Sequence, residues 1–329
     1  MTDRTGIVVL VECEDGTPLP LATELLGLAR SLARGIGGAV TAIALGSGIA
    51  GAGDTLVAHG ADRVYLADDP IFTPYRADAW MAALVETLRD LAPIAVLVGH
   101  GDIGADLAPR LAVRLETAAV TNCISVTAED GGLQFTRPCY GGKVHEVVSL
   151  KTAPAIVTLR AKSHEPATPD EGRQGEVTVL SLDIDPASIR VSIVERRREI
   201  DAGQRLDTAR IVVSGGRGLD GAEGFHNAGN LAQALGGALG ASRVACDLGW
   251  CPPSRQIGLS GRTVAPDLYL ALGISGAAQH MSGCAGAKII VAVNTDPEAP
   301  IFKYCRFGVV GDCKVLAGAL IDAIKNSEG

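Results

Sequence analysis

The chain has 329 residues, of which 47% are hydrophobic and only 4% aromatic, so it is long enough for two domains whose cores are largely aliphatic. Its 41 glycines follow no triplet period and stand beside strand-like aliphatic runs, which excludes fibrous and disordered proteins and indicates glycine-rich turns between buried strands. A formal net charge of -8 argues against a nucleic-acid partner.

The first part of the chain alternates aliphatic runs with segments of helical period, which predicts a parallel sheet. We expect its strands at residues 6–12, 39–45, 63–67 and 94–99. We expect its helices at residues 22–34, 53–59 and 76–91. A further helix is expected to run from Asp102, its predicted N-cap, toward Glu116, with a kink at Pro109.

From residue 118 the pattern changes to short strand-like runs, which we interpret as antiparallel additions to the sheet. These runs lie at residues 120–126, 133–136, 144–150 and 155–160, with a turn at 140–142. Prolines, glycines and charges at 164–175 predict a surface loop, and strands at 177–182 and 190–194 are expected after it. The charged run at 195–199 is expected to be solvated, and the domain boundary is expected near 200–207.

A second series of strands and helices follows this boundary. Its strands are expected at residues 211–214, 243–246, 268–272 and 288–293, and its helices at residues 227–239 and 315–326. The sequence therefore predicts an α/β protein of two domains. The N-terminal domain, residues 1–205, has a nucleotide-binding-like parallel or mixed sheet, and the C-terminal domain comprises residues 206–329.

Four segments of the second domain are candidates for ligand binding. Ser214–Gly218 and Gly273–His280 each follow a predicted strand. Their glycines allow the backbone to approach a ligand closely. In Gly273–His280 the free N–H groups at the start of a helix, with the Ser275 hydroxyl, favour an anion. Residues 248–262 form a long loop of the kind that is usually functional. Residues 294–297 end a strand where ligands bind in α/β sheets. From these residues alone, 214–218 is equally well explained as a packing turn, and 294–297 as a capped turn. For His280 a structural role is favoured.

The chain lacks the sequence motifs of several common enzyme classes. The chain has no nucleophile elbow, no phosphate-binding P-loop and no H-E-x-x-H metalloprotease motif, so no catalytic residue is assigned. The eight cysteines form no C-x-x-C pair, so we expect no metal site. Scattered thiols and an N-terminus without signal features predict a cytoplasmic protein. Two uncharged windows, 35–53 and 268–287, are too rich in glycine or polar groups to predict an integral membrane protein.

Three long strings carry a family resemblance. They are Q-I-G-L-S-G-R-T-V-A-P at 256–266, L-Y-L-A-L-G-I-S-G-A-A-Q-H at 268–280 and I-V-A-V-N-T-D-P-E-A-P-I-F at 290–302. Together they closely resemble the α subunit of electron transfer flavoproteins, and the likeness extends over the whole chain in length and domain order, more weakly before Arg210. The resemblance implies a Rossmann-like FAD-binding C-terminal domain and an N-terminal domain that packs against a separate β subunit.

The resemblance also implies which residues contact the flavin. In the family the guanidinium matching Arg243 lies by the isoalloxazine, the hydroxyl matching Ser260 hydrogen-bonds N5, and the imidazole matching His280 approaches the N1/O2 edge. Donating or positive groups there favour the reduced flavin. Leu259 stands where many members have glutamine, and Cys284 and Cys313 replace residues that are more often apolar. The implied contacts are Arg217, Ser242, Arg243, Ile257, Gly258, Leu259, Ser260, Ser275, Gly276, Ala277, Ala278, Gln279, His280, Asn294 and Asp312.

The function that this resemblance implies is electron transfer rather than conversion of a substrate. FAD would be reduced by partner dehydrogenases and reoxidised by a membrane-linked quinone reductase or another acceptor, in a heterodimer with the β subunit. Two alternatives stay open. One is a nucleotide-binding module with a regulatory or structural role, which the first domain alone would permit, and the other is an electron-bifurcating variant with a second FAD.

Overall fold

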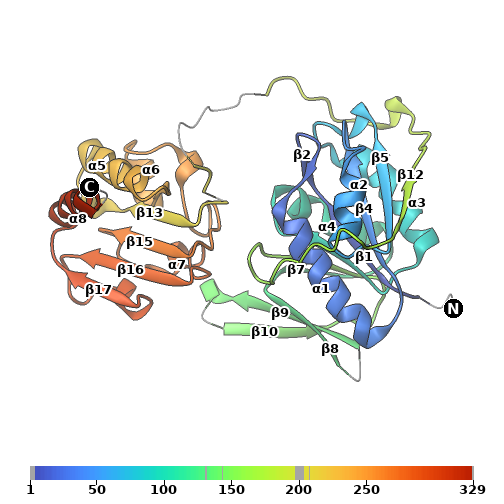
Figure 1. The fold of residues 1–329 in the computed structure, drawn as a ribbon, viewed down its shortest axis with the longest axis horizontal. Helices are drawn as coiled ribbons and strands as arrows, with labels where there is room; N and C mark the ends of the chain where they lie inside the picture. Colours follow the sequence, from blue (N-terminus) through green and yellow to red (C-terminus); the bar gives the residue numbers. More distant parts are fainter. Residues whose placement is uncertain (1–3, 130–131, 143, 197–203, 207, 328–329) are drawn as a thin grey trace. The chain divides into compact units, whose positions relative to one another are not determined.

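The computed structural model describes residues 4–129, 132–142, 144–196, 204–206 and 208–327. The chain folds into two compact units. Unit 1 comprises Met1–Pro138 and His145–Arg196, and unit 2 comprises Cys139–Val144 and Arg197–Gly329. Each unit is built around a parallel sheet (Figure 1), as the predicted α/β class requires. The predicted charged run at 195–199 and the predicted boundary at 200–207 lie mostly outside the described residues.

Unit 1 contains a seven-stranded sheet in which all neighbouring strands run parallel, in the order β12-β5-β4-β1-β6-β11-β7. Its strands are β1 (Ile7–Val11), β4 (Val40–Gly46), β5 (Arg63–Asp68), β6 (Ala95–Gly99), β7 (Ala119–Cys123), β11 (Ala155–Leu159) and β12 (Glu176–Val179). A short hairpin joins β2 (Cys13–Glu14) and β3 (Thr17–Pro18). The central strands are buried along their whole length, because helices cover both faces of the sheet.

Alternate residues of the strands contribute to two separate cores. Val9 and Val11 of β1 pack with α1 and α2, whereas Val8 and Leu10 pack with α3 and α4 on the opposite face. These helices are α1 (Pro20–Ile36), α2 (Ala52–Ala58), α3 (Ala77–Leu91) and α4 (Asp102–Arg114). The expected N-cap Asp102 is instead the first residue of α4, and Gly101 is the N-cap. Pro109 lies inside this helix as predicted.

Three predictions for residues 118–194 are wrong in part. The run at 120–126 is two strands, β7 and β8 (Ser125–Glu129), and only β8 with β9 (Gly132–Cys139) is shown as an antiparallel pair in a small sheet with β10 (Val144–Ser149). The run at 155–160 is β11, which lies parallel between β6 and β7. Its continuous burial, rather than alternation, is the mark of a central parallel strand. Residues 190–194 form no strand, and Val191 and Ile193 are exposed.

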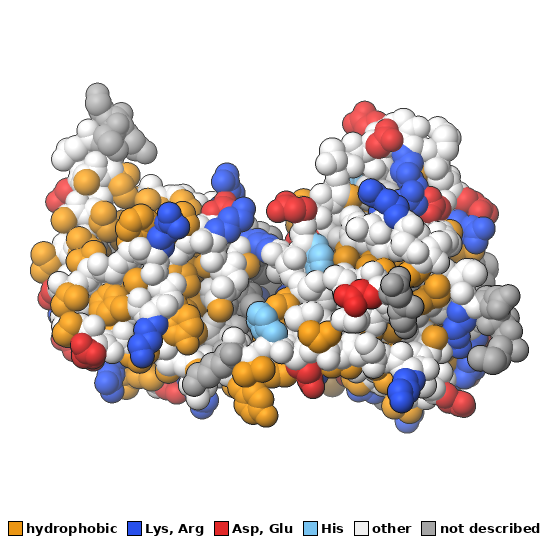
Figure 2. Space-filling view, turned by 90° about the horizontal axis from the view of Figure 1, so that it is seen from below, with side chains coloured by type: hydrophobic (Ala, Val, Ile, Leu, Met, Phe, Trp, Pro, Cys, Tyr) orange, Lys and Arg blue, Asp and Glu red, His pale blue; other side chains and the backbone are white. Residues whose placement is uncertain are grey.

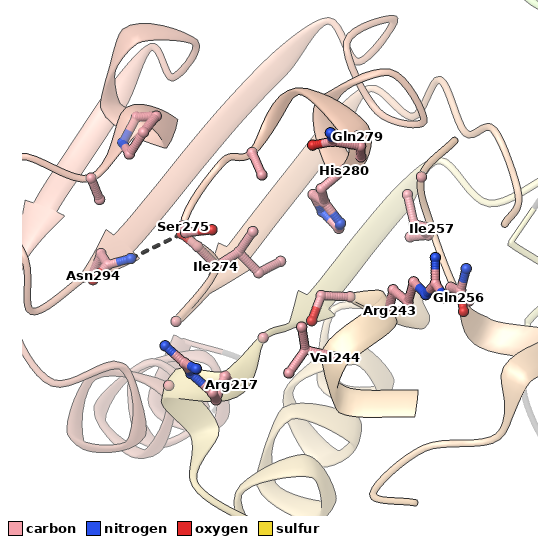
Figure 3. A pocket seen from close by; sticks show the side chains of 18 of the residues that line it. Arg217, Arg243, Val244, Gln256, Ile257, Ile274, Ser275, Gln279, His280 and Asn294 are labelled. Carbon is pink, nitrogen blue, oxygen red and sulfur yellow. Dashed lines mark hydrogen bonds between the residues drawn. The ribbon is translucent and has the colours of Figure 1, made fainter. Parts of the chain in front are cut away.

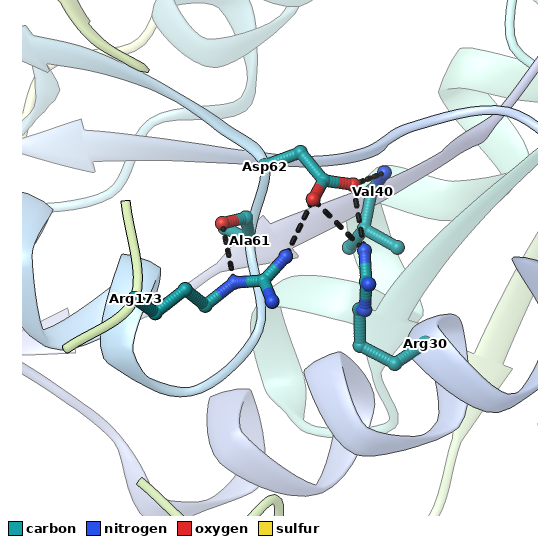
Figure 4. Close-up of polar contacts among 5 residues, drawn as sticks. All are labelled: Arg30, Val40, Ala61, Asp62 and Arg173. Atoms are coloured by element: carbon teal, nitrogen blue, oxygen red, sulfur yellow. Dashed lines mark hydrogen bonds and ion pairs between the residues drawn. The ribbon is translucent and has the colours of Figure 1, made fainter. Parts of the chain in front are cut away.

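The predicted loop at 164–175 is held against unit 1 by an ion-pair cluster (Figure 4). Arg30 of α1 donates to both carboxylate oxygens of Asp62, at 2.9 and 2.7 Å. Arg173 of the loop donates to Asp62 and to the carbonyl of Ala61, and the Val40 amide donates to Asp62 at 2.8 Å. Because Asp62 is two-thirds shielded from solvent, this shared carboxylate connects the loop, α1 and the start of β4.

Glu12 follows β1 at the carboxyl edge of the sheet, beside Asp102 of α4. Burial, with the charge of Asp102 as a second cause, raises the pKa of Glu12 to about 7. Between pH 4.5 and 7 the folded chain therefore keeps a proton that the unfolded chain loses. The free energy of unfolding of unit 1 should thus fall as pH rises through this range.

We expect Glu12→Gln to abolish this fall in the free energy of unfolding, because the neutral amide does not ionise as the pH rises. At pH 4, below the unfolded pKa, the variant should equal the wild type, and at pH 8 its free energy of unfolding should be higher by on the order of 2 kcal/mol. Trp80 of unit 1 can be followed alone by fluorescence in a Trp250→Phe background during urea unfolding. Glu86→Gln, on the exposed face of α3, is the matched control. An equal pH response in both variants would contradict the prediction.

Unit 2 contains a five-stranded parallel sheet in the order β14-β13-β15-β16-β17. Its strands are β13 (Ile211–Gly215), β14 (Ala238–Ala241), β15 (Leu268–Leu272), β16 (Ile289–Asn294) and β17 (Phe307–Val310). Its helices are α5 (Ala222–Ala234), α6 (Arg243–Asp247), α7 (Ala278–Met281) and α8 (Cys313–Ser327). The described 3₁₀ turns of the two units are η1 (Pro70–Phe72), η2 (Tyr140–Gly142), η3 (Pro186–Ser188), η4 (Arg217–Leu219), η5 (Pro253–Arg255) and η6 (Pro300–Lys303).

The two faces of this sheet are covered differently. Helices α5, α6 and α8 pack on one face, whereas irregular segments with the short α7 cover the other. The predicted helix at 227–239 ends at Ala234, because Gly236 takes a positive φ of 61° and the chain turns into β14. The predicted strand at 243–246 is wrong, since these residues form α6 after the N-cap Ser242.

The edge strand β17, which the sequence did not predict, leaves apolar side chains in contact with solvent. Phe307, Val309 and Val310 are 60%, 41% and 60% exposed. Figure 2 shows hydrophobic side chains over much of the face of unit 2 that is turned to the viewer, at the left. Such a surface is larger than single scattered apolar residues would give. Within the described residues, no helix combines the length and apolar character needed to cross a bilayer.

Candidate functional site

Unit 2 has a cavity of about 710 Å³ at the carboxyl ends of its strands. The segments that follow β13, β14, β15 and β16 all line it, together with residues of the long loop 248–262. This is the edge at which open parallel sheets bind ligands, and the volume suits a small molecule or cofactor. Figure 3 shows the lining side chains, which converge from these separate turns.

The cavity brings together most of the residues predicted to contact the ligand. Those that line it are Arg217, Ser242, Arg243, Ile257, Gly258, Leu259, Ser260, Ser275, Ala277, Gln279, His280 and Asn294. Gly276, Ala278 and Asp312 are not among the lining residues. The Asp312 carboxylate instead accepts from the Lys314 amide at 2.8 Å, at the start of α8.

The contacts predicted from the sequence omit several lining residues. They are Gly216, Gly218, Val244, Gln256, Gly273, Ile274, Thr295, Asp296, Ala299 and Pro300. Seven of them, although not among the implied contacts, lie inside the four candidate segments: Gly216, Gly218, Gln256, Gly273, Ile274, Thr295 and Asp296. Val244 is the neighbour of Arg243, and Ala299 and Pro300, at the start of η6, stand in the string 290–302 that carries the resemblance.

Two glycine turns cross at the floor of the cavity with their backbones in contact. The Gly216 amide donates to the Leu272 carbonyl at 2.8 Å, and the Gly218 amide donates to the Gly273 carbonyl at 3.1 Å. A Cβ on Gly273 would lie 2.6 Å from the Gly218 Cα, and Gly273 has a φ of +62°. Glycine is therefore required here for both space and conformation. The crossing leaves room above the strands for a ligand.

Asn294 fixes the loop that follows β15. Its Nδ2 donates to the Ile274 carbonyl at 2.9 Å (Figure 3), and its Oδ1 accepts from the Asp296 amide at 3.0 Å. The predicted helix after this loop, α7, has only four residues, Ala278–Met281. Its dipole is accordingly short, and the positive character of this wall comes mainly from individual N–H groups and side chains.

Two guanidinium groups reach the cavity from neighbouring turns. Arg217 belongs to η4 after β13, and Arg243 begins α6 after β14 (Figure 3). Arg243 lies 3.4 Å from Asp247, but both side chains are about two-thirds exposed, so this pair neutralises the charge only weakly. The cavity thus offers positive charge to an anionic ligand. Leu259, at 72% exposure, adds no polar group.

His280 lines the cavity from α7, although only 8% of its surface is exposed. Its Nε2 lies 2.8 Å from the hydroxyl oxygen of Tyr269, and its Nδ1 is buried with no hydrogen bond to the described residues. Burial lowers the pKa of His280 to about 4, and a backbone group of Ile257 partly offsets this. The imidazole is therefore neutral at physiological pH, and its Nδ1 makes no hydrogen bond of normal geometry within the described residues, although the Ile257 backbone interacts with the ring.

The other polar and sulfur groups of the site are held by a hydrogen bond or kept uncharged by burial. Gln256 donates to the Ser260 hydroxyl at 3.1 Å, which orients that hydroxyl at the loop. Burial raises the pKa of Cys284 to about 12 and also raises that of Cys313, so both thiols stay protonated and act as small core residues. In the part of the chain that the structure describes, no three His, Cys, Asp or Glu residues gather as metal ligands would.

These features together fit a flavin dinucleotide. The buried His280 nitrogen, which has no hydrogen-bond partner among the described residues, would contact the edge of a ring. The glycine backbones would lie against its flat face, and the two guanidinium groups would bind its negative charge.

Comparison with known proteins gives matches in both units. Residues 7–185 match the family model described as electron transfer flavoprotein domain, and residues 205–285 match the electron transfer flavoprotein FAD-binding domain. Electron transfer flavoprotein subunit alpha of Thermoanaerobacterium thermosaccharolyticum is 38% identical over 327 residues, 99% of each chain. The Bacillus subtilis subunit alpha is 38% identical over 320 residues, 97% of each chain. Protein FixB of Clostridium saccharobutylicum is 35% identical over 328 residues, 99% of this chain and 98% of its own.

Proposed function

The chain belongs to the α-subunit family of electron transfer flavoproteins, and from that premise we propose that the cavity of unit 2 binds its FAD. The function of the family is electron transfer, and the chain contains the family's FAD-binding domain. The residues proposed to contact FAD are those predicted from the sequence that line the cavity. The observation that carries the proposal is the orphaned Nδ1 of His280 beside two guanidinium groups and a glycine floor.

FAD, when bound, supplies reversible electron uptake and release. The chain supplies binding, orientation and charge. Arg217 and Arg243 lower the free energy of negative charge in the cavity, and His280, being neutral, offers a ring nitrogen without adding charge. Asn294 keeps the β15 loop in place. None of these groups has to break a covalent bond, which agrees with a carrier that exchanges electrons and converts no substrate of its own.

The proposal includes a β subunit as the partner of this chain, with residues 1–205 packing against it. The relatives are named as alpha subunits, which supports a second, different subunit. The exposed apolar strand β17 supports an additional protein contact in unit 2. Flavin dehydrogenases are the proposed donors, and a quinone reductase or another acceptor receives the electrons. The eight cysteines, all within the described residues, are held as thiols rather than disulfides, which supports a location in the reducing cytoplasm.

The carrier is preferred over a regulatory nucleotide-binding module because both family domains match along the chain. Purification of the chain together with a co-expressed β subunit tests this choice. We expect a yellow heterodimer whose absorption spectrum and extracted flavin give one FAD per pair. A pair that contains no flavin and cannot be reconstituted with FAD would refute the proposal. Two FAD per pair would replace the simple carrier by the bifurcating variant.

A further inference from the structure

Tyr269 is a buried phenol below the cavity, and the proposed flavin contacts do not include it. It lies on β15 and is fully buried, among the largest fully buried side chains of the chain. Its hydroxyl oxygen is 2.8 Å from Nε2 of His280, and the two rings are tilted by 51°. A buried tyrosine hydroxyl needs a hydrogen-bond partner. Loss of this contact would leave the buried hydroxyl without one and would lower the stability of unit 2.

The direction of this hydrogen bond determines what His280 offers to the cavity. A neutral imidazole has one N–H donor and one bare nitrogen. If Tyr269 donates to Nε2, the proton of the imidazole is on Nδ1, and Nδ1 is a donor. If Tyr269 accepts from Nε2–H, Nδ1 is instead an acceptor, and the phenol proton needs another acceptor.

The surroundings of Tyr269 favour donation to Nε2. In the described part of the chain, His280 lies within ordinary hydrogen-bond distance of the phenol oxygen, and Ser214 and Cys284 are its other polar neighbours. Ser214 lowers the pKa of Tyr269, which is the effect of a hydroxyl that donates to the phenol oxygen, so Ser214 is not an acceptor for the phenol proton. Cys284, the other neighbour, already points its sulfur at the His280 carbonyl and the Met281 sulfur, and sulfur is a weak acceptor. Nε2 is thus the best acceptor for the phenol proton.

We propose that Tyr269 is a positioning residue that fixes the neutral imidazole of His280 as the Nδ1–H tautomer, so that the cavity receives a hydrogen-bond donor. The inference deepens the proposed FAD site and rests on it for its functional consequence. Figure 3 shows the imidazole pointing from α7 toward the middle of the lining side chains. A donor at this position binds a flavin edge more strongly as that edge gains electron density, so Tyr269 raises the flavin potential through His280.

The direct test reads the tautomer in the heterodimer labelled with ¹⁵N-histidine, both with FAD and after its removal. Long-range ¹H–¹⁵N spectra distinguish a protonated ring nitrogen from a bare one, and His280→Asn identifies the signals of His280. We expect Nδ1–H in the wild type in both states. Tyr269→Phe, which removes only the hydroxyl, should give a mixture of tautomers. Tyr304→Phe, a half-exposed tyrosine of unit 2 outside the cavity lining, should leave the spectrum unchanged.

The potential of the flavin gives the second readout. Tyr269→Phe should shift it to more negative values in the wild-type background and should have no further effect in the His280→Asn background, since Tyr269 acts through His280. A wild-type Nε2–H tautomer, an unchanged spectrum in Tyr269→Phe, or an equal shift in both backgrounds would overturn the inference. If Tyr269→Phe does not fold, the wild-type tautomer alone decides. A wild type that binds no FAD refutes the proposed function, whereas the flavin-free spectrum still tests Tyr269.

Discussion

Replacement of Gly273 by alanine is expected to weaken FAD binding by the heterodimer strongly. The new Cβ would lie 2.6 Å from the Gly218 Cα and 2.8 Å from the Gly218 carbonyl carbon, which are backbone atoms that cannot rotate away. The φ of +62° adds a further penalty for any residue with a side chain. The two turns below the cavity must then separate, and we expect the FAD affinity to fall at least about a hundredfold, equivalent to about 2.7 kcal/mol.

Gly318→Ala is the matched control for this substitution. Gly318 lies inside α8, and a Cβ there meets no atom within 4 Å. Alanine at an exposed helical position should stabilise unit 2 by up to about 1 kcal/mol and leave FAD binding unchanged. The measurement is the dissociation constant of FAD from flavin-stripped heterodimer, followed by flavin fluorescence. The expectation fails if Gly273→Ala binds FAD within threefold of the control.

Replacement of Arg243 by alanine is expected to make the potential of the bound flavin more negative. The guanidinium reaches the cavity, and the ion pair that it makes with Asp247 is a weak exposed one at 3.4 Å. Loss of this charge removes a group that we propose stabilises the electron-rich flavin. We expect a shift on the order of 50 mV for a one-electron step, equivalent to about 1 kcal/mol, in a spectroelectrochemical titration.

Arg210→Ala removes the same charge at the opposite edge of the sheet. Arg210 precedes β13 and pairs with Asp267 at 2.7 Å, so a strand length of roughly 17 Å separates it from the cavity edge. At ordinary ionic strength this distance exceeds the screening length of about 10 Å. The Arg210 variant should therefore keep the wild-type potential. Equal shifts in both variants, or no shift in Arg243→Ala, would show that Arg243 does not act locally on the flavin.

The sequence predicted the central strands well because their residues are apolar on both faces. Residues 268–272 were predicted as a strand and form β15, and residues 94–99 differ from β6 by one residue. The prediction failed at residues 238–241, where alanine, leucine and glycine carry no β-branched signal, so that the first two residues of β14 were assigned to the helix predicted at 227–239 and no strand was expected there. The direction of β11 depends on which strands it pairs with, and local periodicity contains no such information.

The same limit applies to the site. The glycine turns and the 273–280 segment could be found because their residue types differ from those of an ordinary strand. Tyr269 stands in an aliphatic run and resembles any core residue. Its contact with His280 arises only because the chain leaves β15, turns at Gly273 and returns over the sheet in α7. Spacing could not reveal the pair, because the two residues lie in different elements, Tyr269 on β15 and His280 on α7.

Strand β17 has a consequence for the self-association of the chain. It ends the sheet of unit 2 with a row of backbone groups that have no neighbouring strand on the outer side among the described residues, and its side chains are apolar. An edge of this kind can add a strand from another molecule, which is a route to aggregation. In the proposed heterodimer the β subunit packs against residues 1–205, so this edge in unit 2 would be protected from self-association only where a further partner covers it.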